Sequence, residues 1–147
     1  MKIVVLKFGG TSVADVYQIK KIALKIKLEV ELGYKVITVV SAMSGVTNNL
    51  INLVKNTSDT PPYSEYDTVL STGEQVTSAL LAIALDELKI KARSWLGWQV
   101  PIVTDNTYGK SAIEEIKTDS NKQLNLLYDI HSNNDKNFIG KKFIINE

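Results

Sequence analysis

Apolar and polar positions along the first forty residues predict a strand, a helix and a second strand. Residues 2–8 and 36–40 each contain consecutive β-branched or aliphatic residues, a pattern typical of strands that are buried on both faces. Between them, apolar residues recur at spacings of three and four, which predicts an amphipathic helix along Val16, Ile19, Ala23, Ile26 and Val30. Together the three elements predict a βαβ unit with a right-handed crossover.

Polar residues and a glycine mark the two ends of this helix. Thr11 and Ser12 each carry a hydroxyl that can accept a hydrogen bond from the first helical turn, so we expect one of them to be the N-cap. Gly33 is placed to end the helix in the left-handed backbone conformation.

The next sixty residues continue the alternation of helices and strands. The pattern predicts, in order, a helix with Val46, Leu50, Leu53 and Val54 on one face, a loop over 56–63, a short strand over 67–70, a turn over 71–74, an apolar helix over about 75–88, and strands over 90–95 and 100–104. Alternation of this kind favours an α/β layered fold.

The C-terminal third has a different composition. Residues 106–137 are rich in Asn, Lys, Asp and Ser, with weak helical patterns at 111–117 and 122–130. Residues 143–145 are apolar and predict a last short strand. We expect residues 106–147 to be partly disordered.

Composition excludes several classes of function. The 147 residues suit one domain, and a net charge of +1 gives no electrostatic case for binding nucleic acid or an anionic membrane. Without cysteine there is no disulfide framework, thiolate metal site or cysteine nucleophile, and the single histidine, His131, makes no triad or zinc cluster. No apolar run approaches the ~20 residues of a membrane span, and the chain opens on a strand rather than a signal peptide. We therefore expect a cytoplasmic protein.

The end of the first strand is a candidate phosphate site. Lys7 is followed by Phe8, Gly9 and Gly10, and glycines before a helix let backbone N–H groups face an anion. A lysine on a strand that is covered on both faces needs a partner, and a bound phosphate is one. The motif is not the Gly-x-x-x-x-Gly-Lys-Ser/Thr loop of common NTPases. A tight strand-to-helix turn with an incidental lysine is the alternative.

A second turn follows the second strand. Ser41, Ser44 and Thr47 supply hydroxyls there, and Asn48 supplies an amide. Taken alone, this pattern is that of an ordinary helix start with Ser44 as the N-cap. Ligands of open α/β sheets, however, bind at the carboxyl ends of the strands. Because both turns lie at such ends, we expect them to share one crevice.

Glu74 lies in a third turn. Ser71 and Glu74 fit a capping box, in which the carboxylate would accept a hydrogen bond from the Ser71 amide. In the functional interpretation, Gly73 lets a ligand approach and Glu74 attracts an ammonium group beside the phosphate site. That pairing of charges suits an amino-acid substrate next to ATP.

Taken together, the turns resemble motifs of the aspartate kinase family. Four segments match that family in order and spacing across about a hundred residues: Lys7-Phe8-Gly9-Gly10-Thr11-Ser12-Val13, Val39-Val40-Ser41-Ala42-Met43-Ser44-Gly45-Val46-Thr47-Asn48, Leu70-Ser71-Thr72-Gly73-Glu74-Gln75, and Gly97-Trp98-Gln99 with Thr104-Asp105. The third segment resembles aspartate kinase more than other amino-acid kinases.

The resemblance implies a three-layer α/β/α sandwich with a mostly parallel sheet. It also implies ATP-dependent phosphorylation of the L-aspartate β-carboxylate to 4-phospho-L-aspartate, the first step toward lysine, threonine and methionine, with Mg²⁺ bridging the phosphates. By the same resemblance, the ATP phosphates are held by Lys7, Phe8, Gly9 and Gly10, with Lys7 catalytic, and the substrate is bound by Ser41, Thr47 and Glu74. No protein metal site is implied.

The resemblance covers about residues 1–105, and the remainder diverges from the family pattern. The sequence has no match to the family's second half, with its nucleoside pocket, or to its regulatory domains. We therefore expect the N-terminal segment of a kinase domain, incomplete or split, that forms a homo-oligomer or joins a complementary chain. A non-catalytic remnant or interaction module of the same fold is one alternative. Another is a kinase for glutamate or acetylglutamate, which Ser71–Gln75 disfavours.

Overall fold

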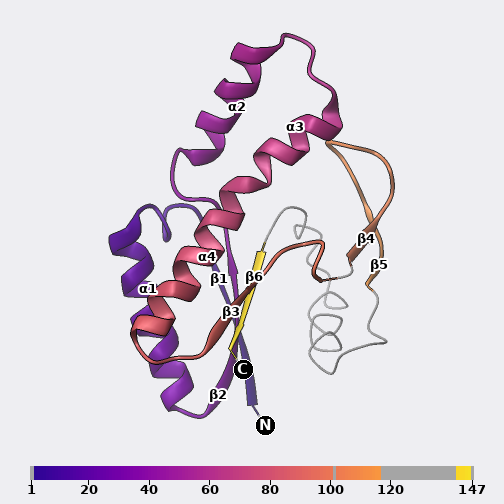
Figure 1. The fold of residues 1–147 in the computed structure, drawn as a ribbon. Helices are drawn as coiled ribbons and strands as arrows, with labels where there is room; N and C mark the ends of the chain where they lie inside the picture. Colours follow the sequence, from indigo (N-terminus) through magenta and orange to yellow (C-terminus); the bar gives the residue numbers. More distant parts are fainter. Residues whose placement is uncertain (1, 101, 117–141, 147) are drawn as a thin grey trace.

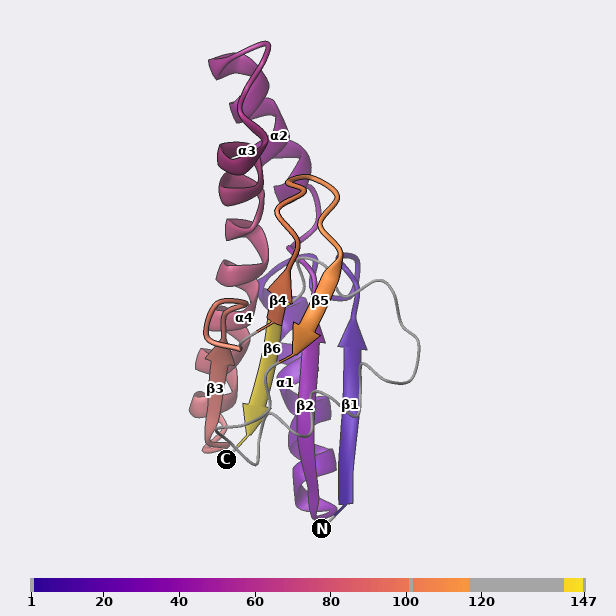
Figure 2. The same cartoon turned by 90° about the vertical axis from the view of Figure 1, so that its right-hand side faces the viewer.

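The computed structural model describes residues 2–100, 102–116 and 142–146 and arranges them as a β-sheet flanked by helices (Figures 1 and 2). The elements in chain order are β1 (Lys2–Phe8), α1 (Val16–Glu31), β2 (Tyr34–Val40), α2 (Val46–Thr57), α3 (Tyr63–Leu70), α4 (Thr72–Glu87), β3 (Ala92–Trp95), β4 (Ile102–Thr104), β5 (Ile113–Ile116) and β6 (Lys142–Asn146).

The main sheet has the strand order β1-β2-β6-β3. β1 and β2 are parallel, from Lys2 opposite Tyr34 to Phe8 opposite Val40, as the predicted βαβ unit requires. β6 is antiparallel to both β2 and β3, so β1, β2 and β3 all run in one direction. The strands predicted over 2–8, 36–40, 90–95, 100–104 and 143–145 are thereby confirmed.

The core lies between one face of this sheet and the helices α1 and α4. Leu6 and Phe8 of β1 pack toward it, and Val36 and Val40 of β2 are almost completely buried there. Figure 1 shows α1 and α4 to the left of the strands, and Figure 2 shows them behind the sheet. The segment before α1 and the two helices supply the other buried members of this cluster, Val13, Ile19, Ile22, Ala23, Ile26, Leu81 and Leu85.

Helix α1 begins later than the sequence predicted. Its N-cap is Asp15, whose carboxylate accepts a hydrogen bond from the Gln18 N–H at 2.8 Å, so neither Thr11 nor Ser12 caps it. The two hydroxyl residues lie in the turn before the helix, because Ser12 N–H is bonded to the Gly9 carbonyl. The prediction for Gly33 is confirmed, since its φ is +86°.

Helix α2 has fewer buried residues than its sequence pattern suggested. Val54 is buried, whereas Leu53 of the same predicted face is 61% exposed. Gly45, with φ of +77°, is the N-cap and makes no side-chain bond, so the expected Ser44 cap is wrong.

The short strand expected over 67–70 is instead part of helix α3. Ser71 N–H donates to the Asp67 carbonyl at 3.0 Å, so helical hydrogen bonding continues through Ser71 toward α4. The Thr72 hydroxyl donates to the Val69 carbonyl at 2.7 Å, a type of contact that bends helices. Figure 1 shows α3 and α4 as consecutive parts of one long helical path.

This path, Tyr63–Glu87, is long and apolar enough to cross a membrane by length and composition alone. The sequence pattern had indicated no run of that length. One such helix is weak evidence for a membrane span, because a core helix meets the same criteria. In α4, Leu81 and Leu85 are buried in the core, whereas Val76 and Ile83 are exposed.

β4 and β5 form an antiparallel hairpin that is separate from the main sheet. The helix expected over 111–117 is therefore wrong, because residues 113–116 pair with β4. The turn between the two strands is ordered by its own hydrogen bonds. The helix expected over 122–130 lies outside the described residues.

Candidate functional site

The turns after β1 and β2 lie against each other. Ser41 N–H donates to the Phe8 carbonyl at 3.1 Å, which extends the parallel pairing beyond the strands. Gly10 lies so close to the second turn that a Cβ there would be 3.2 Å from the Ala42 carbonyl oxygen. Glycine at position 10 therefore allows the close approach of the two chains.

The third turn reaches the same point. The Glu74 carboxylate accepts a hydrogen bond from Ala42 N–H at 3.2 Å through Oε1. A Cβ at Gly73 would lie 2.9 Å from the Ala42 Cβ, so α4 begins in direct contact with the turn after β2. The capping-box alternative is wrong, because Ser71 is helical and the Glu74 side chain is bound to Ala42 instead. All three motif-bearing segments thus meet around Ala42.

Lys7 leaves β1 on the face of the sheet opposite to α1 and α4. Its neighbours Leu6 and Phe8 pack toward the helices, and successive side chains of a strand alternate between faces. The expectation that β1 is covered on both faces is wrong, since Val5 on the Lys7 face is 40% exposed. Lys7 and Glu74 therefore approach the strand ends from opposite faces, and no ion pair joins them within the described residues.

A cleft of about 380 Å³ contains two of the predicted substrate residues, Thr47 and Glu74. Its other wall residues come from α3, the α3–α4 junction and the β4–β5 hairpin, namely Asp67, Leu70, Ser71, Thr104, Gly109 and Ser111. Ser41 and the predicted phosphate residues are not among the described wall residues. The arrangement brings together two carboxylates and several hydroxyls.

The charge of this wall favours a cationic group. Asp67 and Glu74 are its only charged members among the described residues, and both are acids. The sequence interpretation found Glu74 but missed Asp67, which it had assigned to a strand. The signal that could have found Asp67 is helical spacing, since it precedes Glu74 by seven residues, two turns of a helix.

The hairpin that carries Thr104 has a well-ordered turn. The Asp105 carboxylate accepts a hydrogen bond from Thr107 N–H at 2.9 Å, and Asp105 N–H donates to the Ala112 carbonyl at 3.0 Å. The hydrogen bond from the Thr107 backbone lowers the pKa of the Asp105 carboxyl below its usual value of 3.8, although desolvation acts in the opposite direction. Asp105 therefore closes the turn as a carboxylate at neutral pH.

The residues at the end of β1 fit a bound phosphate chain in part. Lys7 is an exposed cation, and a Cβ at Gly9 would meet nothing within 4 Å, so an anion has room to approach. The described residues contain no group of three or more His, Cys, Asp or Glu that could hold a metal ion.

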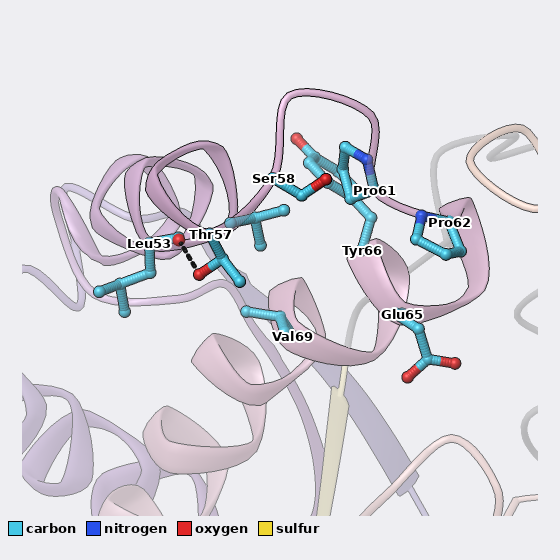
Figure 3. Close-up of a pocket in the computed structure, with 9 residues that line it drawn as sticks. Leu53, Thr57, Ser58, Pro61, Pro62, Glu65, Tyr66 and Val69 are labelled. Atoms are coloured by element: carbon cyan, nitrogen blue, oxygen red, sulfur yellow. Dashed lines mark hydrogen bonds between the residues drawn. The ribbon is translucent and has the colours of Figure 1, made fainter.

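A separate cavity of about 370 Å³ lies between α2 and α3 (Figure 3). Its wall is mainly apolar and includes Leu53, Pro61, Tyr66 and Val69. The Thr57 hydroxyl at its edge already donates to the Leu53 carbonyl at 2.8 Å. None of the predicted site residues lines this cavity, so the cleft at Glu74 is the candidate site.

The sequence of the chain is similar to that of known proteins. A sequence model described as the amino acid kinase family matches residues 2–140. The chain belongs to the amino acid kinase family. Among curated proteins, it is 52% identical to the aspartokinase of Rickettsia felis over 122 residues, which is 81% of this chain and 30% of that protein.

Solved structures of amino acid kinases show the same fold. The aspartate kinase of Synechocystis is 46% identical with a TM-score of 0.57, over 60% of this chain and 15% of that one. E. coli aspartokinase III, solved in complex with aspartate and ADP, has a TM-score of 0.61 at 19% identity, over 78% of this chain and 35% of that one. The fold prediction is thereby confirmed, and the N-terminal portion of the chain matches aspartate kinase. The chain spans about a third or less of the length of these relatives.

Proposed function

We propose that this chain is the amino-acid-binding part of an aspartate kinase. In this proposal it phosphorylates the β-carboxylate of L-aspartate with ATP, in company with a segment that supplies the rest of the relatives' length. The observation that carries the proposal is the meeting of three aspartate-kinase motifs around Ala42, with Thr47 and Glu74 in one cleft.

The acidic cleft would hold the ammonium group of the substrate. Glu74 attracts a cation, and the hydroxyl of Thr47 can donate a hydrogen bond to a carboxylate. Ser41 stays a predicted substrate contact at the edge of this region. An α-amino acid carries both groups, so it suits the cleft better than a simple anion or an amine.

Lys7 would neutralise charge on the transferring phosphoryl group. Phe8, Gly9 and Gly10 form the turn beside it, where backbone N–H groups can hold the phosphates. The phosphates would approach from the Lys7 face and the amino acid from the Glu74 side, so the two reactants would meet over the strand ends. ATP supplies the phosphoryl group with Mg²⁺ on its phosphates, and the substrate carboxylate is itself the nucleophile. We place the reaction in the cytoplasm, at the entry to lysine, threonine and methionine synthesis.

A hydroxylamine trap for acyl phosphate tests this proposal. The chain would be assayed with ATP, Mg²⁺ and L-aspartate, alone and together with the remaining segment of the Rickettsia felis aspartokinase. We expect aspartyl hydroxamate only with the added segment, because the chain covers 30% of that relative. Lys7→Ala and Glu74→Ala should each lower the rate by about 100-fold or more, the usual effect of losing one preorganised charge contact.

Glu65→Ala is the matched control, because Glu65 is a carboxylate on α3 that lies in the wall of the other cavity. Its rate should stay within about twofold of the wild type. Hydroxamate formed from glutamate or acetylglutamate in preference to aspartate would reassign the substrate. No hydroxamate under any condition, with unchanged ligand binding in both site variants, would instead identify a non-catalytic module.

A further inference from the structure

A hydrogen bond joins helix α3 to the tip of the β4–β5 hairpin. Asp67 Oδ2 accepts from Gly109 N–H at 2.7 Å, across 42 residues of sequence. This distance is at the short end of the range for N–H···O hydrogen bonds. The two partners come from elements that the main sheet does not connect, as Figures 1 and 2 show.

The hairpin tip is shaped to make this contact. Gly109 has a φ of +76°, a left-handed conformation that glycine adopts without strain. The tip is held in shape by local bonds, including the Ser111 hydroxyl to the Thr107 carbonyl at 2.9 Å. Tyr63 and Asp67 are four residues apart on one face of α3. Asp67 binds the Gly109 N–H, and the Tyr63 ring borders the position that a Cβ at Gly109 would take.

This contact lies in the wall of the cleft that contains Glu74. Asp67 and Gly109 both line the cleft, and the hairpin contributes Thr104 and Ser111 to the same wall. Within the described residues, the hairpin has no strand pairing with the main sheet. Its position at the cleft therefore depends on contacts such as this one.

We propose that Asp67 is a positioning residue, whose hydrogen bond to Gly109 docks the β4–β5 hairpin on α3 and so fixes that wall of the cleft. The effect of this docking on substrate binding rests on the proposed function, because the docked wall would set the affinity for the acceptor amino acid. The docking itself does not require any ligand.

The substitution Asp67→Asn separates positioning from charge. Asparagine keeps an oxygen that can accept from Gly109 N–H, but it removes the negative charge. Asp67→Ala removes both the accepting oxygen and the negative charge. Glu65→Ala removes the same charge from α3 without touching the cleft, so it is the matched control.

Amide hydrogen exchange of Gly109 tests the docking in the 147-residue chain. In Asp67→Ala, exchange at Gly109 should become about tenfold faster, while Asp67→Asn and Glu65→Ala stay within about threefold of the wild type. Unchanged exchange in Asp67→Ala, or an equal increase in Glu65→Ala, would overturn the proposal. Similar acceleration in the Asn and Ala variants would show that charge, rather than the hydrogen bond, holds the hairpin, and would overturn it as well.

The effect on the substrate is measured in the complemented enzyme. Asp67→Ala should raise the KM for aspartate about tenfold with kcat within about threefold of the wild type, and Asp67→Asn should recover most of that loss. Equal KM values in the wild type and Asp67→Ala would refute the positioning role. If the complemented enzyme forms no hydroxamate, the proposed function fails, and Gly109 exchange alone then decides the docking.

Discussion

At the scale of single residues, the site depends on small side chains where three segments meet. Gly10, Ala42 and Gly73 lie close enough that one added methyl group would bring atoms to 3.2 Å or less. This closeness lets the Glu74 carboxylate reach Ala42 N–H. The sequence predicted that Lys7, Thr47 and Glu74 lie at one end of the sheet, but it could not predict which partner holds Glu74. A capping box with Ser71 and a contact with Ala42 would both use the same glutamate at position 74, so the local sequence does not distinguish them.

Gly73→Ala tests this packing. In an exposed helix, alanine in place of glycine would stabilise by up to about 1 kcal/mol, but here the new Cβ would lie 2.9 Å from the Ala42 Cβ. We expect overpacking to dominate and to lower the free energy of unfolding by about 1–3 kcal/mol, measured by urea denaturation. Gly9→Ala is the control, because a Cβ there meets nothing within 4 Å and should change stability by less than about 1 kcal/mol. An unchanged or raised stability in Gly73→Ala would contradict the close contact.

At the scale of elements, the long amphipathic helix and the buried strands could be predicted, and the short elements could not. Residues 67–70 are too few to show a period, and the helix signal there comes earlier, from Pro62 at the N-cap and Glu65 in the first turn. In β5, Glu114 and Glu115 favour a helix by intrinsic propensity, yet pairing with β4 determines the structure. Because of these two errors, the sequence did not identify Asp67 and Ser111 as residues that line the cleft.

The N-cap of α1 provides a test at this scale. Asp15→Ala removes the hydrogen bond to Gln18 N–H and should lower the free energy of unfolding by about 1 kcal/mol. Asp15→Asn should retain most of it, because asparagine is an equally good cap. Ser12→Ala, at the position that the sequence first suggested, should change stability by less than about 0.5 kcal/mol in the same urea titration. A larger loss in Ser12→Ala than in Asp15→Ala would restore the original assignment.

At the scale of the whole molecule, the sequence predicted the layered fold but not how the sheet is completed. β6 lies between β2 and β3 although it is the last element of the chain, and it runs against both neighbours. Local patterns specify that residues 143–145 form a strand, but they do not specify its partners or its direction. Likewise, the consecutive apolar residues of β1 did not show whether other parts of the chain cover one face of this strand or both faces.

The core beneath α4 gives the test at this scale. Leu81 is completely buried, so Leu81→Ala should leave a cavity and lower the free energy of unfolding by about 2–5 kcal/mol. Ile83→Ala, two residues later on the same helix, removes a side chain that is 65% exposed and should cost less than about 1 kcal/mol. Equal losses in the two variants, measured by denaturant unfolding, would show that α4 packs on a different face.

Helix α4 carries both a core residue and a residue of the candidate site. Leu85 anchors its inner end in the core, and Glu74 lies eleven residues away, roughly 16 Å along the axis. A tilt of about 5° at the anchor would move the carboxylate by roughly 1.4 Å, a misplacement large enough to impair a catalytic geometry. Replacements deep in the hydrophobic interior can therefore change ligand recognition without touching the ligand. Packing strength and binding geometry would then have to evolve together in this molecule.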